Sequence, residues 1–357
     1  MTLSASHPLM DGRTADSPLI SAYRGQTPSR RPVWFMRQAG RSLPEYRRVR
    51  EGIGMLESCL QPELAAEITL QPVRRHDVDA AIFFSDIVIP LKLAGVGVDI
   101  VSGVGPVLDR PVRTAADVAA LPTLEDAALD PIREAVARTV DELGHTPLIG
   151  FAGAPFTLAA YMVEGRPSRD HLGPRTMMHA APETWAALAN WAAEVSGQFL
   201  RAQVEAGASA AQLFDSWAGS LGRADYERHV APASARALDA VRDTGVPLVH
   251  FGTGTSEILQ PMRDVGVDVV GVDYRLPLDE ANRRLGGTVP LQGNIDPALL
   301  DAPWEVLEAH VREVIAAGEA APGHVLNLGH GVPPTTDPEV LTRLVSLIHS
   351  IDVTGGQ

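Results

Sequence analysis

Residues 32–50 read Pro-Val-Trp-Phe-Met-Arg-Gln-Ala-Gly-Arg-Ser-Leu-Pro-Glu-Tyr-Arg-Arg-Val-Arg. The apolar run at 33–36 is typical of a buried strand. Five arginines fall in this stretch, although the whole chain has a formal net charge of −14. An arginine fork meets carboxylate or phosphate through two hydrogen bonds, so we interpret Arg37 and Arg41 as binders of an anionic ligand. Surface ion pairs are the simpler interpretation for the arginines that follow in an expected helix, Arg47, Arg48 and Arg50.

The composition is that of a soluble globular chain with a sizeable core: 357 residues, 45% hydrophobic and 21% charged. The negative net charge argues against nucleic acid and anionic membrane as partners. No apolar run approaches the roughly 20 residues of a membrane helix. Residues 1–27 lack the basic start and apolar core of a signal peptide, so we expect a loosely ordered arm and a cytoplasmic location.

Two residue types are nearly absent, and this limits the chemistry. Cys59 is the only cysteine, so the sequence offers no disulfide framework and no multi-cysteine metal site. Lys92 is the only lysine and lies between two leucines. Schiff-base chemistry and pyridoxal phosphate both need an active-site lysine, so both are disfavoured.

Short apolar runs alternate with helical patterns along the chain. The eight runs are 33–36, 80–84, 147–151, 210–214, 247–251, 268–272, 289–291 and 324–328. The main helical segments are 63–75, 183–205, 226–243, 255–264, 304–317 and 339–351. This alternation predicts a (β/α)₈ TIM barrel formed by one domain over residues 28–357. A doubly wound open sheet is the alternative, but no glycine fingerprint follows the first run.

Two insertions are expected in this barrel. Residues 95–107 are rich in glycine and valine and predict an extra hairpin after the second strand. Residues 109–146 are expected to hold additional helices.

Polar residues follow most of the runs, where the active site of such a barrel lies. They are Arg37, Arg41, Asp86, Ser216, His250, Asp273, Tyr274, Asn294 and His330. Asp86 is expected to be partly buried and to need donors from protein or ligand, unless it caps a helix or pairs with an arginine. Ser216 lacks the Gly-x-Ser-x-Gly elbow of a nucleophile, which favours a binding hydroxyl. For Tyr161 and His330 the residues alone leave structural and functional roles open.

Several motifs together resemble the uroporphyrinogen decarboxylase family. Residues 32–41 are similar to its N-terminal signature and residues 150–157 to its second signature. Phe-Phe-Ser-Asp at 83–86, Phe-Asp-Ser at 214–216 and Gly-His-Gly at 329–331 also match, in order and at compatible distances. The resemblance covers roughly residues 20–350.

The resemblance implies a carboxy-lyase of porphyrin and heme biosynthesis. Such an enzyme converts the four acetate side chains of uroporphyrinogen III to methyls, giving coproporphyrinogen III and CO₂. It also implies that no metal or organic cofactor is used and that the chain forms a homodimer.

Site roles follow from the same resemblance. Asp86 and Arg37 are the implied catalytic residues, with Asp86 accepting the pyrrole N–H groups and stabilising a protonated pyrrole. Arg37 and Arg41 are expected to hold substrate carboxylates. The proton donor stays open between Arg37, a bound water and a substrate carboxyl. The other implied substrate contacts are Gln38, Ala39, Gly40, Tyr161, Ser216, His330, Phe84 and Phe151.

Two other functions are considered. A zinc-dependent corrinoid or thiol methyltransferase shares the barrel, but would want a His-x-Cys motif where this chain has His-Phe-Gly at 250–252. A non-catalytic tetrapyrrole-binding barrel is the second alternative.

Overall fold

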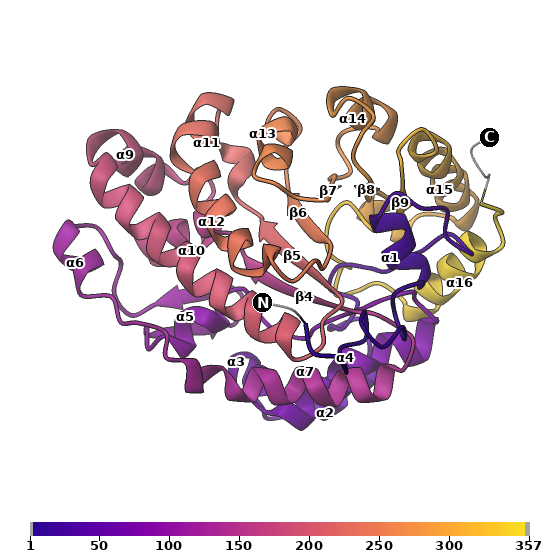
Figure 1. Ribbon diagram of the computed structural model, residues 1–357, viewed down its shortest axis with the longest axis horizontal. Helices are drawn as coiled ribbons and strands as arrows, with labels where there is room; N and C mark the ends of the chain where they lie inside the picture. The colour runs from indigo at the N-terminus through magenta and orange to yellow at the C-terminus, as the bar shows by residue number, and fades with distance from the viewer. Residues whose placement is uncertain (1–2, 354–357) are drawn as a thin grey trace.

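The computed structural model of the protein describes residues 3–353. Its main feature is a parallel seven-stranded sheet in the order β1-β4-β5-β6-β7-β8-β9. The strands are β1 Ala81–Ile82, β4 Leu148–Gly153, β5 Ala210–Asp215, β6 Leu248–Gly252, β7 Val269–Gly271, β8 Leu291–Gln292 and β9 His324–Val325. Each of the last seven predicted runs overlaps one of these strands, and Figure 1 shows helices ranged around them. The barrel-like α/β fold is confirmed.

The first run closes the ring without being a regular strand. Val33 makes an isolated parallel bridge to Leu326, beyond β9. On its other side the carbonyl of Val33 accepts the N–H of Asp79 (2.8 Å), just before β1. The predicted strand at 33–36 is therefore wrong in detail, although the segment occupies the eighth position of the barrel.

Side chains explain why no regular strand forms there. The N–H groups of Val33, Phe35 and Met36 donate to side-chain oxygens instead of to a neighbouring strand. The acceptors are Asp79 Oδ2 (2.8 Å), Gln38 Oε1 (2.9 Å) and Asn327 Oδ1 (2.9 Å). The residues of this run are buried and hydrogen-bonded, but they do not form the regular hydrogen-bond ladder of a β-strand.

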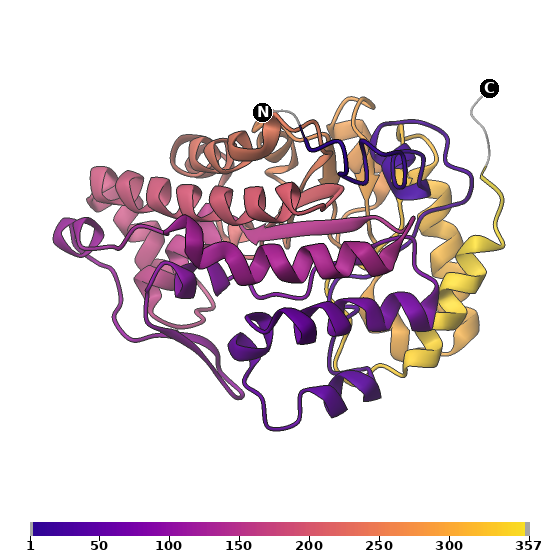
Figure 2. The same ribbon diagram turned by 60° about the horizontal axis from the view of Figure 1, so that its bottom comes forward.

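Helices lie outside the sheet. They are α1 Pro18–Tyr23, α2 Pro44–Val49, α3 Met55–Cys59, α4 Pro62–His76, α5 Ile89–Leu93, α6 Ala115–Ala119, α7 Asp130–Leu143, α8 Pro155–Glu164, α9 Leu172–Ala180, α10 Pro182–Glu205, α11 Arg223–His229, α12 Ala231–Arg242, α13 Leu259–Asp264, α14 Leu278–Arg284, α15 Trp304–Gly318 and α16 Pro338–His349, with short 3₁₀ turns η1 Asp126–Leu129, η2 Ala218–Ser220 and η3 Pro297–Asp301. Proline opens many of them, since its missing N–H costs nothing in the first turn. In Figure 2 the long helices α7 and α10 run alongside each other across the outside of the sheet.

The predicted helix at 226–243 is two helices, α11 and α12, that meet at Val230. Pro232 lies in the first turn of α12 and has no N–H to donate to the carbonyl four residues earlier, so the helix cannot run through.

Both predicted insertions are present. Strands β2 Val98–Val101 and β3 Gly105–Leu108 form an antiparallel hairpin after β1. The stretch 109–146 holds α6, η1 and α7.

The N-terminal segment differs from the expectation of a loosely ordered arm. Helix α1 buries Leu19, Ile20 and Tyr23 completely or nearly so, and the Tyr23 hydroxyl donates to Gln292 Oε1 in β8 (2.5 Å). These apolar side chains form part of the core. The polar residues around them in the sequence kept this short apolar pattern from being recognised as a core helix. Residues 1 and 2 lie outside the described part.

Within residues 3–353 no helix is both long and apolar enough to cross a bilayer.

Candidate active site

Asp86 lies just beyond β1 and supplies an acid. Its Oδ1 accepts the N–H of Val88 (3.0 Å) in a short turn before α5. Its Oδ2 has no hydrogen-bond partner among residues 3–353. Burial raises the pKa of this half-buried carboxyl above its ordinary value, and the Val88 N–H and then the charge of Arg37 oppose the rise. When ionised, Asp86 has one oxygen held by the backbone and one available to a ligand.

Arg37 occupies the turn that ends the first run. Its φ of 61° lies in the left-handed region, which non-glycine residues rarely adopt. The turn is held by Gln38, whose side chain accepts the N–H of Phe35 (2.9 Å) and donates to the carbonyl of Ala80 (3.0 Å). The side chain of Gln38 therefore positions Arg37, and both of its polar groups are bound within the protein.

Arg37 belongs to the same electrostatic group as Asp86. Its stem lies against Gly331, where an added Cβ would come within 2.5 Å of Arg37 Cδ. Burial is the main influence on the pKa of Asp86, of Tyr161 and of His330, and the charge of Arg37 acts on all three as a smaller one. The structure thus brings these predicted residues together.

The backbone of the Arg37 turn offers donors, as expected. The N–H of Gln38 is already bound to the carbonyl of Phe35 (3.0 Å). Those of Ala39 and Gly40 have no partner within the described residues, so two of the three expected backbone donors are available. Arg41 is exposed, and its side chain has no hydrogen bond or ion pair within 3–353, so its role as a carboxylate ligand stays a prediction.

Tyr161, on α8, is one ring of an aromatic cluster. It stacks on Trp217 with centroids 3.8 Å apart, and His171 contacts the same indole at 4.3 Å. Burial, followed by the charge of Asp86, raises the pKa of Tyr161 to about 12, so the phenol stays protonated and can donate. Neither Trp217 nor His171 was predicted from the sequence. Trp217 directly follows Ser216, which is a usable signal, whereas nothing local marks His171.

Ser216 and two aromatic residues complete the predicted set on this side. Ser216 follows β5, and its hydroxyl has no partner in the described chain. Phe151, in β4, contacts Phe214 edge-on with centroids 5.3 Å apart. Phe84 is buried beyond β1 and contacts Tyr46 edge-on at 5.8 Å. These rings give apolar surface beside the polar groups.

His330 follows the last strand segment. Its Nδ1 accepts the N–H of Gly331 (2.8 Å), which leaves Nε2 as a possible donor. Although the residue is exposed overall, partial burial of its ring lowers its pKa, and the charges of Arg37 and Arg275 lower it further. A neutral imidazole with a free Nε2–H is suited to donate to a carboxylate.

Arg275 was also missed. It is exposed and pairs with the buried carboxylate of Asp273 (2.5 Å). Its position two residues after Asp273, an acid predicted to follow a strand, could have identified it from the sequence.

Two other residues at strand ends, His250 and Asn294, are buried in the protein. His250 is fully buried in β6, with its Nε2 3.6 Å from Asp215 Oδ2. Asn294 donates to the carbonyls of Asp273 (2.8 Å) and Leu276 (2.6 Å). The amide of Asn294 is therefore bound by the protein itself, whereas neither ring nitrogen of His250 has a hydrogen-bond partner among the described residues.

The arginines predicted to form surface ion pairs behave otherwise. Arg50 donates to the carbonyl of Ile53 (2.9 Å) and to the hydroxyl of Tyr46 (2.5 Å). Arg47 and Arg48 are exposed without an ion pair inside the described range. Long side chains on a water-facing helix lose entropy when paired, so free arginines are unremarkable there.

Six of the predicted ligand-binding residues share one property. Among residues 3–353 each of them keeps a polar group that no other residue binds: Arg37 and Arg41 guanidiniums, Asp86 Oδ2, Tyr161 Oη, Ser216 Oγ and His330 Nε2. Asp86, Tyr161 and Ser216 are wholly or partly buried, and polar groups in such places normally find partners, so their free groups indicate a site for a polar ligand.

Metal-ligating residues do not gather here. Cys59 is buried in α3, and no group of three possible ligands among the described residues includes Cys59 or His250. Lys92 is exposed on α5. The residues of this site therefore do not present the thiolate set of the rival zinc methyltransferase.

Comparison with solved structures agrees with the fold. A methyltransferase from Methanosarcina mazei superposes with a TM-score of 0.78 at 20% identity, over 94% of this chain and 98% of that one. A B12-independent methionine synthase from Shewanella gives a TM-score of 0.53 at 10% identity, over 81% and 87%. At these identities the likeness concerns the fold alone.

Sequence comparison is far more specific. The family model described as uroporphyrinogen decarboxylase (URO-D) matches residues 14–351. The uroporphyrinogen decarboxylase of Arthrobacter sp. (strain FB24) is 85% identical over 96% of this chain and 99% of that protein. The uroporphyrinogen decarboxylase of Leifsonia xyli subsp. xyli is 61% identical over 97% and 98%. The chain belongs to the uroporphyrinogen decarboxylase family.

Proposed function

We propose that this protein removes CO₂ from the four acetate side chains of uroporphyrinogen III and so yields coproporphyrinogen III. The observation that carries the proposal is the set of polar groups left free around Asp86: cations and neutral donors for carboxylates, and one carboxylate oxygen for pyrrole N–H groups. A ring with eight carboxylates outside and four N–H groups inside is complementary to that set.

The chemistry needs a place for the electrons of the breaking C–C bond. Protonation of a pyrrole carbon makes the ring a cation, and the electron pair of the departing carboxylate then neutralises it. A second proton reaches the exocyclic carbon and the first leaves the ring. The net change at each side chain is an acetate plus one proton converted to a methyl plus CO₂.

Asp86 is the proposed stabiliser of the pyrrole cation. A preorganised charged contact at a developing charge is typically worth about 3–4 kcal/mol. Arg37 would hold a substrate carboxylate next to it, and the neutral Tyr161 and His330 would donate to others. An arginine is a poor acid, since its pKa is above about 12, so water or a substrate carboxyl is the better proton donor.

A product assay tests the function. Uroporphyrinogen III is incubated with the purified protein under reducing conditions, and the products are separated by carboxylate number. We expect tetracarboxylate product, with intermediates of seven, six and five carboxylates at short times. Recovery of bound but unchanged octacarboxylate would instead identify a tetrapyrrole carrier.

Three further properties inherited from the resemblance are part of the proposal. Turnover should survive exhaustive chelation, since no step is assigned to a metal. The mass in solution should be about twice the 38.0 kDa of one chain if a homodimer forms. We infer a cytoplasmic location, which fractionation of the source cells would test.

A further inference from the structure

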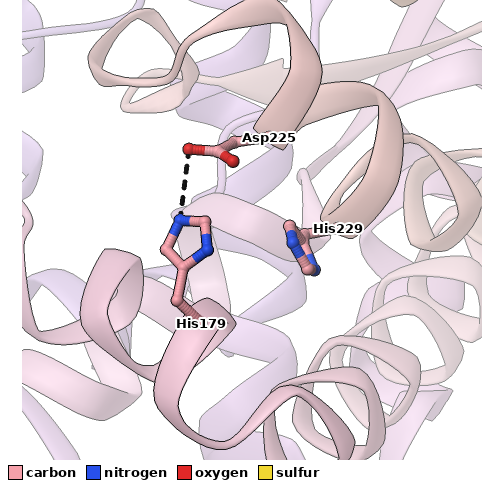
Figure 3. A group of neighbouring side chains, drawn as sticks. All are labelled: His179, Asp225 and His229. Atoms are coloured by element: carbon pink, nitrogen blue, oxygen red, sulfur yellow. Dashed lines mark ion pairs between the residues drawn. The ribbon is translucent and has the colours of Figure 1, made fainter.

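A cluster of potential metal ligands lies away from the proposed active-site residues. His179 near the end of α9 faces Asp225 and His229 of α11, and Figure 3 shows the three side chains converging between the two helices. Asp225 and His229 are four residues apart and so share one face of their helix. Their ligand atoms and that of His179 all lie within 4.8 Å of one another.

The spacing suits a small divalent cation. His179 Nε2 is 3.4 Å from Asp225 Oδ2. Zinc binds histidine nitrogen and carboxylate oxygen at about 2.0–2.1 Å, and tetrahedral geometry then separates two ligand atoms by roughly 3.3–3.4 Å. One edge of the tetrahedron is therefore already formed, and the remaining ligand atom lies within 4.8 Å of the other two.

The helices hold the cluster firmly. Buried Met178 anchors α9 next to His179. The carbonyl of His229 accepts the indole N–H of Trp185, from α10 (2.8 Å), which fixes the backbone of α11 at that residue. Ligands carried on anchored helices lose little freedom on binding a metal.

A plain ion pair explains less of this arrangement. The side chain of His179 is 60% exposed, and an exposed pair contributes about 0–1 kcal/mol. Such a pair gives no reason for a second imidazole, whose ring centre lies 5.6 Å from that of His179. Within residues 3–353 the ring of His229 has no hydrogen-bond partner.

We propose that His179, Asp225 and His229 bind one first-row divalent cation, with zinc as the best fit. Two imidazoles and one carboxylate form a set that zinc uses, and the exposed side leaves the fourth position to water. The bound ion joins α9 to α11. The site stands apart from the proposed decarboxylation and takes no part in it.

The site also has a structural connection to the aromatic cluster. His171 immediately precedes α9 and contacts Trp217, and η2 leads from Trp217 toward α11. A cation that joins the two helices therefore restrains the segments on both sides of this indole.

Titration calorimetry of the chelator-treated full chain with Zn²⁺ tests the proposal. We expect saturable binding of one ion per chain. Even outer partners of metal ligands change affinity by about 10–100-fold, so H179A and H229A should each lower the affinity more than about tenfold. H145A is the matched control, because His145 is exposed and remote from the cluster in sequence, and it should bind Zn²⁺ as the native protein does.

Stability gives a second readout that does not involve turnover. Zn²⁺ should raise the melting temperature of the native chain and of H145A, and should slow amide exchange in α9 and α11. It should do neither in H179A, whose exposed position makes misfolding of the variant an unconvincing explanation. Absence of saturable binding, or equal binding by the native chain and H179A, would overturn the proposal whatever the decarboxylase assay shows.

Discussion

Burial raises the pKa of the Asp86 carboxyl, and the guanidinium of Arg37 works against part of that rise. The two residues come from turns after different segments of the barrel, one left-handed turn after residues 33–36 and one short turn after β1. The N–H of Val88 and, to a smaller extent, the charge of Arg37 therefore favour the ionised carboxylate against the effect of burial.

The first prediction concerns the acid limb of the pH profile. In the proposed mechanism turnover requires ionised Asp86, so activity should be lost as pH falls through the pKa of that group. Replacing Arg37 by Gln removes a positive charge that lowers this pKa, so the pKa rises and the acid limb of kcat/KM moves to higher pH. Arg48→Gln, at an exposed position without an ion pair in the described chain, is the control. An acid limb unmoved in Arg37→Gln would show that the two groups are not coupled.

Gly331→Ala should imitate loss of Arg37. A Cβ at position 331 would lie 2.5 Å from Arg37 Cδ and push the flexible arginine side chain aside. We expect a fall in activity of at least about tenfold, with unfolding stability changed by less than about 1 kcal/mol. Gly222→Ala is the matched control, because nothing lies within 4 Å of its added Cβ. Equal activity of the two variants would contradict the placement of Arg37.

Tyr161→Phe isolates the hydroxyl from the ring. The stack on Trp217 survives, and the hydroxyl that goes has no protein partner among residues 3–353. A hydrogen bond to a charged group is worth about 1.5–3 kcal/mol, so kcat/KM should fall roughly 10–100-fold while the melting temperature stays near that of the native protein. Unaltered kinetics would assign Tyr161 to the core only.

Acid should weaken the fold through buried histidines. Burial lowers the pKa of His76 and of His324 to about 4 from 6.5. The unfolded chain then binds more protons than the folded chain below pH 6.5, so the free energy of unfolding falls as pH drops from about 6.5 toward 4. Each histidine contributes a slope of up to about 1.4 kcal/mol per pH unit.

Denaturant titrations at several pH values measure that slope. His76→Gln keeps a side chain able to bond to Thr342 Oγ1, which contacts His76 Nδ1 at 2.8 Å, and removes one titrating group. The slope between pH about 6.5 and 5 should become shallower in this variant. A slope equal to that of the native protein would exclude His76 as its source.

Much of the barrel could be predicted from the sequence because parallel strands are buried on both faces. The residues of β4, β5 and β6 are all buried, so each appears as a mainly apolar run, although Gln212 lies within β5 and His250 within β6. The segment at 33–36 has the same composition, but its N–H groups bind side chains of Asp79, Gln38 and Asn327. Hydrogen bonds of this kind depend on the folded structure, so they cannot be predicted from an apolar sequence pattern.

The candidate site was predictable to the extent that its residues follow strands. Asp86 and Ser216 do, and both keep a polar group unbound by the described protein. His171 does not, because it reaches Trp217 from a long connection between α8 and α9. Asn294 also follows a strand, yet its amide is used by two backbone carbonyls, a commitment visible only in three dimensions.

The most direct test of the central claim compares CO₂ release by the native chain and by Asp86→Asn under saturating uroporphyrinogen. Asparagine retains the oxygen that accepts the Val88 N–H but loses the negative charge, and folding should not suffer, since burial disfavours the ionised carboxyl. We predict a rate lower by at least about a hundredfold, as expected from losing about 3–4 kcal/mol of charge stabilisation, with circular dichroism and melting unchanged. A variant that releases CO₂ at close to the native rate would contradict the role given to Asp86.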